Sequence, residues 1–407
     1  MHRGWCGGMV IPDRRQIYEW AAEHINLPTS YAIPGPFNVG ISRYMLEPFQ
    51  AVHDDRNREI DVVAAVQTGK TLWEEICALW LLANQPASMM WTMQTDEDAK
   101  EYCKSRLNEL LKSCGPIQSI LPSDRHMRNT QEIYFGGFFI LINGANINSL
   151  QSKSIRHKLN DEVWLWDEGL IEHAKNRVNA FRDADCSRVI SVSQAGKIDS
   201  DWHKQWSGGT CRHWSVYCPG CKRHIELLRQ HGKENKRAGL CWDFKAQDEN
   251  GKWDVARCVE TAHYMCPNCG HIWEDTDKTR MEWNRKGVYL GTLDNPLGHE
   301  SFSWNALVRT KMAVLVKKLT EYENLKLKGI TQPLAECYMQ DFSEFVNEET
   351  FADVVEIVAG DYEMHEYFDG DKKIDGEVAR FMSIDRQINR YYCLIRAYRS
   401  DGSSRLI

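Results

Sequence analysis

The segment Gln67-Thr68-Gly69-Lys70-Thr71 has the residue types that bind a nucleoside triphosphate. Backbone N–H groups of such a loop and of the helix that follows it face the phosphate oxygens. The Lys70 ammonium would pair with the β- and γ-phosphates, and the Thr71 hydroxyl would bind Mg²⁺. The full pattern G-x-x-x-x-G-K-[ST] is not met, because Ala64 occupies the position of the first glycine. We interpret the segment as a P-loop for ATP and Mg²⁺, and an exposed helix start with a capping threonine is the alternative.

A P-loop also needs acidic residues at the end of a second strand, one for the magnesium ion and one to activate the attacking water. Two Asp-Glu pairs are candidates for these roles. Asp167-Glu168 follows the apolar run 163–166, which is the better pattern for a buried strand. Asp161-Glu162 follows 157–160 (His-Lys-Leu-Asn), which is a poor one. The residue pattern alone therefore favours Asp167.

Four cysteines form two Cys-Pro-x-Cys pairs, Cys218 with Cys221 and Cys266 with Cys269. This spacing lets both thiolates of a pair contact one Zn²⁺, and two pairs complete a tetrahedral site. We predict one structural zinc ion, whose closed shell leaves no position open for catalysis. A redox role is the weaker interpretation, because neither pair lies at a strand-to-helix junction. Three nearby histidines are alternative ligands, although we expect them not to bind: His224, His263 and His271.

The elements around these motifs alternate between strand and helix patterns. The β-branched run 58–66 predicts a buried strand, and the spacing of apolar residues in 70–84 predicts a helix. Strands that alternate with helices predict an α/β domain with a mainly parallel sheet, at about 41–210. Further patterns predict a strand at 89–93, a helix from Thr95-Asp96 to about Ser113, a hairpin in 131–142 and a strand at 188–192.

Composition divides the rest of the chain. Residues 1–40 form an N-terminal segment, and 211–285, rich in Cys, Trp and charge, form a zinc-binding insertion. Residues 286–378 have weak helical patterns, notably 311–328, and predict a helical subdomain or linker. A last pair of strands begins at Arg380.

The bulk composition excludes several classes of protein. The net charge of −7 argues against a globally basic nucleic-acid binder but allows a local basic track. No apolar stretch reaches the roughly 18 residues that span a bilayer, and the N-terminus lacks the apolar core of a signal peptide. We therefore expect a cytosolic protein whose 14 cysteines are metal ligands or buried thiols.

The order of these motifs resembles the phage terminase large subunit of the GpA type, over nearly the whole chain from about residue 42. The segment 66–71 is similar to the family's abbreviated Walker A motif, which also lacks the first glycine. Other segments that resemble the family are 44–48 (Tyr-Met-Leu-Glu-Pro), 150–156 before the Walker B motif, 262–264, Met281, Gly287 and 301–307.

The resemblance implies a RecA-like (ASCE) P-loop NTPase fold and changes the choice of acidic pair. It places that pair eleven residues after Leu150, with Asp161 as the magnesium ligand and Glu162 as the catalytic carboxylate. Asp167 stays as the alternative. Ser193, in the strand end 191–194, would belong to the coupling motif that senses the γ-phosphate.

The function that the resemblance implies is ATP-driven translocation of double-stranded viral DNA into the procapsid. The implied partners are the terminase small subunit and the capsid portal, and the implied setting is a homo-oligomeric ring in the host cytoplasm, with no membrane. Lys222-Arg223 and 233–237 are basic clusters that either contact DNA or form solvated loops.

A second, RNase H-like nuclease domain of the family would cut DNA with carboxylates that hold two metal ions. The segment 382–387 resembles its first strand, which makes Asp385 the candidate metal ligand. About 22 residues follow Asp385, so we expect 379–407 to be only the start of that domain. We therefore expect no nuclease activity from this chain alone, whether it is a truncated, split or decayed form.

One departure from the family bears on catalysis. Related motors carry a basic residue at about 64–66, where this chain has Ala-Ala-Val, so a cation would have to come from elsewhere or from a neighbouring subunit. The neutral loop favours a non-catalytic, zinc-containing packaging adaptor as one alternative. Another P-loop motor such as a helicase is the other, but no second RecA-like pattern follows residue 286.

Overall fold

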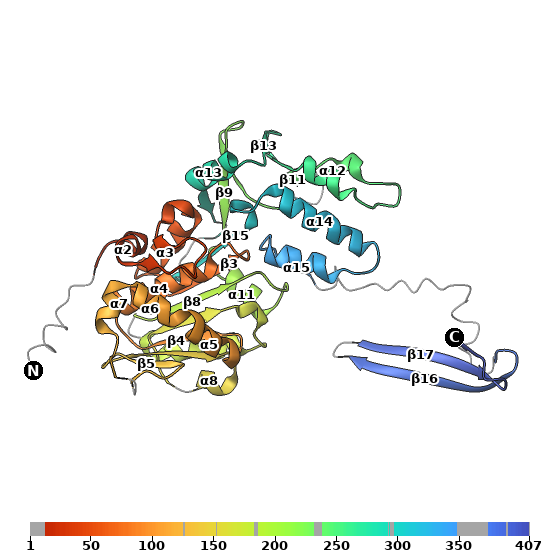
Figure 1. Cartoon of the computed structure of the whole chain (residues 1–407), viewed down its shortest axis with the longest axis horizontal. Coiled ribbons are helices and arrows are strands. Elements are labelled where there is room, and N and C mark those ends of the chain that lie inside the picture. The colour runs from red at the N-terminus through yellow and green to blue at the C-terminus, as the bar shows by residue number, and fades with distance from the viewer. Residues whose placement is uncertain are drawn as a thin grey trace, which may run out of the picture. The chain divides into compact units, whose positions relative to one another are not determined.

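The computed structural model describes residues 13–124, 127–151, 153–182, 186–231, 238–291, 293, 297–347, 373–387 and 390–406, with the backbone alone for 385–387, 390–394 and 406. The chain divides into two compact units, Met1–Asp353 and Val354–Ile407. The P-loop, both acidic pairs and the four paired cysteines all lie in the first (Figure 1).

A ten-stranded sheet forms the centre of the first unit. Its order is β10-β9-β15-β3-β8-β7-β4-β6-β5, with β14 paired to β9. The strands from β9 to β6 are parallel to their neighbours, and β10, β14 and β5 are antiparallel at the margins. In sheet order, with β14 last, the bounds are Arg223–Glu226, Arg212–Cys218, His299–Trp304, Glu59–Ala64, Arg188–Ser193, His157–Asp161, Met89–Met93, Phe139–Gly144, Glu132–Tyr134 and Val288–Leu290.

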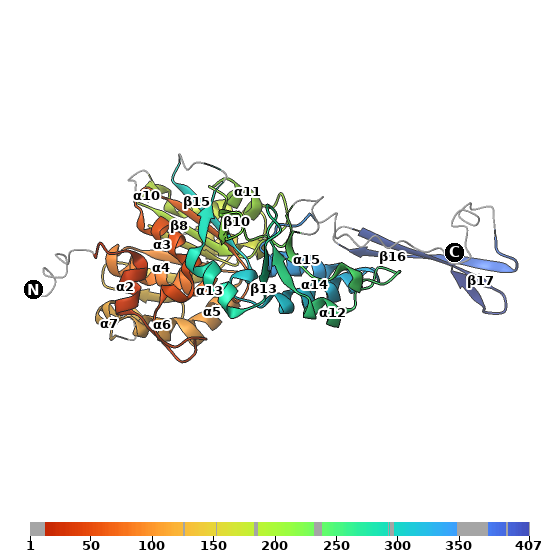
Figure 2. The ribbon, with the colours of Figure 1, turned by 90° about the horizontal axis from the view of Figure 1, so that it is seen from above.

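Helices cover both faces of this sheet. In Figure 2, α2, α4, α6 and α7 lie on one side of it, and α10 and α11 lie on the other. Coverage of both faces explains why β3, β4 and β8 are buried along almost their whole length. The helices are α2 (Ile17–His24), α3 (Leu46–His53), α4 (Lys70–Asn84), α5 (Asp96–Tyr102), α6 (Asn108–Ser113), α7 (Gly115–Ile120), α8 (Ile147–Gln151), α9 (Leu170–Lys175), α10 (Asn179–Arg182), α11 (Asp201–Ser207), α12 (Val255–Glu260), α13 (Asp277–Lys286), α14 (Met312–Lys326) and α15 (Gln332–Gln340).

The α/β fold with a mainly parallel sheet is confirmed, and so are its local patterns. The run 58–66 contains β3, and the hairpin of 131–142 is the antiparallel pair β5–β6. Thr95 caps α5 as expected, accepting a hydrogen bond from the Asp98 backbone N–H. A π-helical turn, Cys103–Leu107, separates α5 from α6 within the helix predicted up to Ser113.

The sheet extends beyond the expected domain boundary at residue 210. β15 lies beside β3, at the centre of the sheet, although the region 286–378 was expected to be helical. Its sequence, His-Glu-Ser-Phe-Ser-Trp, begins with three polar residues and contains only two apolar ones. It therefore lacks the apolar pattern that predicts a buried strand. The polar side chains are nevertheless buried, because Thr210 Oγ1 donates to Glu300 Oε2 (2.8 Å) and Cys211 N donates to Ser301 Oγ (2.8 Å).

A buried ion pair fastens β15 to β3. His299 Nε2 lies 2.7 Å from Asp61 Oδ2, and Asp61 is fully buried. Burial alone lowers the pKa of His299, but the charge and hydrogen bond of Asp61 raise it more, so that the net pKa lies above the usual value. The folded chain therefore holds this proton more tightly than the unfolded chain does.

This pair predicts a pH-dependent contribution to stability. The pair stabilises the folded state fully below the unfolded pKa of histidine, about 6.5, and the effect is lost as pH rises through the higher folded pKa. His299→Gln should therefore lower the free energy of unfolding more at about pH 6 than at about pH 9. Urea unfolding at both pH values measures this, and an equal loss at the two would contradict it.

The predicted zinc-binding insertion, 211–285, contains a small sheet of its own. β11 (Gly239–Cys241), β12 (His263–Met265) and β13 (Ile272–Glu274) are antiparallel. Tyr264 packs edge-to-face against Trp283 with ring centroids 5.3 Å apart, and Trp273 lies against both rings. These aromatic rings form the core of a segment that has few aliphatic residues.

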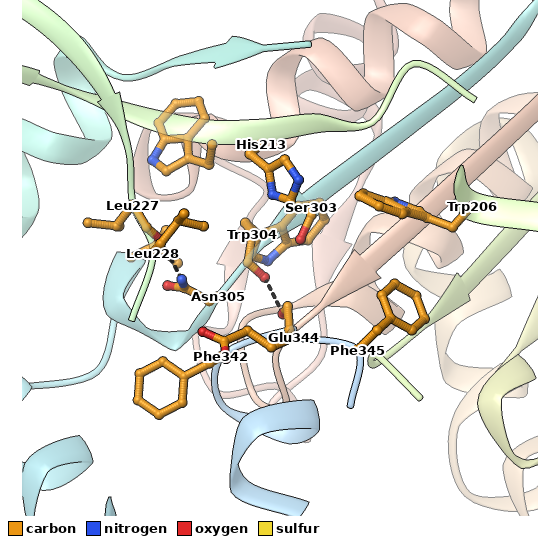
Figure 3. A pocket seen from close by; sticks show the side chains of 13 residues that line it. Trp206, His213, Leu227, Leu228, Ser303, Trp304, Asn305, Phe342, Glu344 and Phe345 are labelled. Carbon is orange, nitrogen blue, oxygen red and sulfur yellow. Dashed lines mark hydrogen bonds between the residues drawn. The ribbon is translucent and has the colours of Figure 1, made fainter. Parts of the chain in front are cut away.

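The end of α15 and the segment that follows it form hydrogen bonds with three parts of the central sheet and its loops. Gln340 O accepts from Val66 N (2.9 Å), Ser343 Oγ donates to Trp304 O (2.8 Å), and Val346 N donates to Gly196 O (3.0 Å). Residues 342–345 of this segment line a cavity of about 280 Å³. Figure 3 shows Phe342, Glu344 and Phe345 at this cavity, together with Trp304 from the end of β15. The segment thus joins the P-loop, the end of β15 and the residues after β8.

The second unit contains a three-stranded antiparallel sheet. Its strands are β16 (Glu377–Gln387), β17 (Arg390–Arg399) and β18 (Ser404–Leu406). The strand pair expected from Arg380 is confirmed. Of the described residues in the whole chain, none belongs to a helix long and apolar enough to cross a membrane.

Candidate nucleotide-binding site and metal centre

The P-loop connects the end of β3 to the start of α4. Gly69 has φ 92°, a left-handed conformation that favours glycine, and α4 begins at Lys70. Ala64 is the last residue of β3 and has no positive φ, so a glycine is not required there. The loop therefore forms with a single glycine.

Three side chains hold the loop in place. Thr68 Oγ1 donates to Ala65 O (2.6 Å) within the loop. Trp304, at the end of β15, donates from Nε1 to Thr68 Oγ1 (2.9 Å), and the Tyr44 hydroxyl donates to Thr68 O (2.8 Å). All of these groups are buried, so water does not compete for the hydrogen bonds that hold the loop.

The acidic pair lies across β8 from the P-loop. β7 ends at Asp161, and Glu162 follows it with φ 49°. Glu162 Oε1 lies 2.5 Å from Lys70 Nζ. Burial, and then the neighbouring Glu162 carboxylate, raise the pKa of Asp161 to about 7. A carboxylate with a raised pKa gains from a nearby cation, which fits the expected magnesium ligand.

The strand expected before Asp167 is absent. Residues Val163–Leu165 form a 3₁₀ helix, and Val163 packs in a small cluster with Ile171 and Trp202. Asp167 and Glu168 are exposed in the following turn. The apolar run therefore serves packing after the strand and does not lead an acidic pair into the site.

The polar run 157–160 forms the buried strand instead, because each polar end has a partner. His157 Nε2 bonds to Gln85 O (2.8 Å), and Lys158 Nζ donates to Thr92 Oγ1 (2.6 Å). Asn160 Nδ2 donates to Ser191 Oγ (3.1 Å). Burial lowers the pKa of His157 to about 3, and it lowers the pKa of Lys158 well below its usual value.

Ser193 is the last residue of β8, between the strands that carry the P-loop and the acidic pair. Its hydroxyl accepts a hydrogen bond from the backbone N–H of Trp164 (3.1 Å). It thus contacts the segment directly after Glu162. This position is consistent with the coupling role expected for it, which stays a prediction.

A cleft of about 510 Å³ opens beside the P-loop. Gln67, Gly69, Lys70 and Thr71 line one side of it. The other side comes from the N-terminal segment, around the short strands β1 (Asn26–Leu27) and β2 (Gly35–Pro36), and from two arginines: Tyr31, Ile33, Phe37, Ile41, Arg106 and Arg309. The sequence analysis did not assign this wall, because its residues come from distant parts of the chain.

The four paired cysteines meet at one point. Their sulfur atoms all lie within 4.8 Å of one another, with Cys218 Sγ 3.7 Å from Cys269 Sγ and Cys221 Sγ 3.9 Å from Cys266 Sγ. A tetrahedral zinc site with Zn–S bonds of about 2.3 Å requires sulfur separations of about 3.8 Å. The cluster therefore has the dimensions of a Zn²⁺ site.

Glycine and histidine positions support a cluster of cysteines alone. A Cβ atom on Gly220 would lie 2.9 Å from Cys269 Sγ, so a larger residue would crowd the sulfurs. His224 bonds to Lys286 O, and His263 bonds to Thr261 O. His271 packs against Trp273. Within the described residues, the four cysteines are the group whose ligand atoms converge.

Residues 31–288 match the family described as the phage terminase large subunit gpA, ATPase domain. The match spans more than half of the chain. The chain belongs to this family. It is thus a terminase large-subunit ATPase of viral DNA packaging, and the alternative functions, helicase or zinc-containing adaptor, are not favoured.

Solved terminases are similar to the chain at low identity. The large terminase ATPase domain of Thermus phage P74-26 has 13% identity and a TM-score of 0.41, over 83% of this chain and 100% of that one. The large terminase of bacteriophage HK97 has 10% identity and a TM-score of 0.45, over 98% and 67%. These scores are too low to carry an argument about individual residues. No curated protein sequence matches the chain significantly.

The structure describes the predicted nuclease ligand and the predicted basic clusters only in part. Asp385 lies in β16, opposite Tyr392, and its side chain is not described, so its role as a nuclease metal ligand stays a prediction. Lys222 and Arg223 are exposed, whereas the cluster 233–237 lies outside the described residues.

Proposed function

We propose that this terminase chain hydrolyses ATP at the P-loop and uses the energy to move double-stranded DNA into a procapsid. The observation that carries the proposal is the contact between Lys70 Nζ and Glu162 Oε1 at 2.5 Å, which supports Glu162 as the Walker B carboxylate beside the P-loop cation. The proposed partners are DNA, the terminase small subunit and the portal, in a homo-oligomeric ring in the host cytoplasm.

The residues divide the work as follows. Backbone groups of 67–71 and the Lys70 ammonium bind the phosphates, while Thr71 and Asp161 supply the oxygen ligands that suit Mg²⁺. Bound Mg²⁺ supplies positive charge against the phosphate oxygens. Ser193, the last residue of β8, couples this strand to the segment after Glu162 by accepting a hydrogen bond from Trp164 N.

The Lys70–Glu162 pair also suggests how binding prepares hydrolysis. In the chain without nucleotide, the ammonium and the carboxylate neutralise each other. Phosphate oxygens carry more charge and compete for the ammonium. Glu162 is then free to accept the proton of the attacking water, which is the task of a general base.

The zinc centre is proposed as structural. Cys218 ends β9 and Cys266 follows β12, so one ion would join the ATPase sheet to the small sheet of the insertion. A closed four-cysteine shell offers no open position to a substrate. DNA contacts, for which Lys222 and Arg223 are candidates, should fall on phosphates and weaken with salt.

Lys70→Ala tests the nucleotide site. Loss of this charge-assisted contact should weaken MgATP binding by about 10- to 100-fold and remove turnover, because no other cation stands in the loop. Calorimetric titration and phosphate release measure the two effects. Lys175→Ala is a matched control, because Lys175 pairs with Glu59 away from the cleft and should change neither effect.

The same two measurements also distinguish an ATP-hydrolysing motor from a non-catalytic adaptor. Equal MgATP affinity in the parent and Lys70→Ala would contradict the nucleotide site. Binding without any DNA-stimulated hydrolysis in the parent would instead support a non-catalytic adaptor.

A further inference from the structure

The P-loop of this chain offers few positive charges to a highly charged ligand. ATP carries about four negative charges, and its transfer chemistry depends on cations around the phosphates. Residues 64–69 are all uncharged, so Lys70 is the only cation that the loop itself contributes. A further cation must come from another element if the site is to balance that charge.

Two arginines line the cleft beside the P-loop, Arg106 and Arg309. Arg106 is already engaged, because its Nε lies 2.6 Å from Glu75 Oε1 and its guanidinium lies over the Tyr31 ring at 4.4 Å. Glu75 is fully buried, and if Arg106 moved it would keep the hydroxyl groups of Tyr31 and Tyr102 but lose its counter-charge. Arg106 is therefore a structural residue of the cleft wall.

Arg309 is placed differently. It is exposed, and among the described residues no carboxylate forms an ion pair with it. Its guanidinium lies close to the buried Tyr44 hydroxyl: burial raises the pKa of Tyr44, and Arg309 opposes that rise. Tyr44 itself bonds to Thr68 O, so Arg309 stands one residue away from the P-loop backbone.

The backbone that carries Arg309 is firmly held. Arg309 follows the 3₁₀ helix Ala306–Val308, which the Asn305 side chain caps by accepting from Leu307 N. Ala306 N donates to Asp341 O (2.7 Å), and Trp304 bonds directly to Thr68. The distance from this turn to the P-loop is thus fixed by buried hydrogen bonds.

The strand order sets the direction from which Arg309 reaches the cleft. β15 adjoins β3 on the side away from β8 and β7, so Arg309 approaches opposite to Asp161 and Glu162. The cleft is therefore lined by both Lys70 and Arg309, and the Arg309 side chain reaches it from the side of β3 away from the acidic pair. A guanidinium binds phosphate oxygens in a bidentate geometry, which suits it to this task.

We propose that Arg309 binds the phosphate chain of the nucleotide and supplies, within the same subunit, the cation that the P-loop lacks. This rests on the proposed function of the cleft as an ATP site. Arg309 lies outside residues 31–288, so the family match does not assign it.

Nucleotide affinities of charge variants test the proposal. Arg309→Ala should weaken MgATP and MgADP binding by about 10- to 100-fold and AMP binding by less than about threefold. Arg309→Lys should retain part of the affinity, and Arg309→Glu should bind MgATP more weakly than Arg309→Ala. Lys311→Ala removes an exposed cation two residues away that does not line the cleft, and should bind like the parent. Calorimetric titration gives the affinities, and thermal melting checks that each variant is folded.

The outcomes distinguish this proposal from the proposed function. If Lys70→Ala weakens MgATP binding and Arg309→Ala does not, only the role of Arg309 is overturned. Equal losses for ATP, ADP and AMP would show that Arg309 does not bind the β- and γ-phosphates and would also overturn it, as would an order of variants that does not follow charge. If the parent does not bind MgATP, the proposed function fails as well.

Discussion

Glu162→Gln should leave ATP binding intact and lower the rate of hydrolysis by about 10²- to 10⁴-fold. The amide keeps the shape of the carboxylate but cannot accept a proton from water. It also removes the charge that pairs with Lys70 in the chain without nucleotide, so MgATP should bind as tightly as before or more tightly. Calorimetric titration and phosphate release measure binding and turnover separately.

Glu168→Gln is the matched control for this substitution. Glu168 belongs to the alternative acidic pair and is exposed in the turn before α9. It should hydrolyse ATP at the parent rate. If Glu168→Gln loses turnover and Glu162→Gln keeps it, the assignment of the catalytic carboxylate is wrong.

Loss of the predicted zinc ion should have a large effect on the stability of the folded chain. We expect about one zinc ion per chain, and Cys221→Ser should remove it and lower the free energy of unfolding by several kcal/mol. The physical reason is that four thiolates within 4.8 Å repel one another or must take up protons when no cation is present. Elemental analysis and denaturant unfolding measure the two quantities.

Cys186→Ser is the control for this prediction. Cys186 is half-buried and lies outside the cluster. It should keep its zinc and nearly all of its stability. A fully folded preparation of the parent chain that contains no zinc would contradict the metal centre.

Local sequence signals predicted the parts of the site whose residues are close in sequence. The P-loop flanks, the hairpin and the cysteine pairs each need only a short segment to fold in a typical way. Spacing within a Cys-Pro-x-Cys pair fixes its turn, so the meeting of two such pairs required only that the insertion bring them together. The structure brings all four sulfur atoms to one point.

Long-range contacts explain what the pattern of residues missed. β7 reads as polar because the partners of His157, Lys158 and Asn160 lie on other elements, up to 72 residues away. β15 is hidden for the same reason, since Glu300 and Ser301 depend on the segment 210–211. The choice of Asp161 and Glu162, which lie at the end of β7, came from the resemblance to the terminase family.

The position of Arg309 in the cleft also depends on long-range contacts and could not be predicted from the sequence pattern. Its sequence neighbours carry no nucleotide-binding pattern, and its closeness to the P-loop follows from the pairing of β15 with β3. Only the topology of the sheet shows that a residue 239 positions after Lys70 lines the same cleft.

Phosphate release from MgATP in the presence of double-stranded DNA tests the central claim most directly, with the parent chain and Glu162→Gln measured side by side. We predict that DNA stimulates release by the parent and that Glu162→Gln removes it while still binding MgATP. Release by the parent that never exceeds that of Glu162→Gln, with DNA and Mg²⁺ present, would contradict ATP hydrolysis at this site.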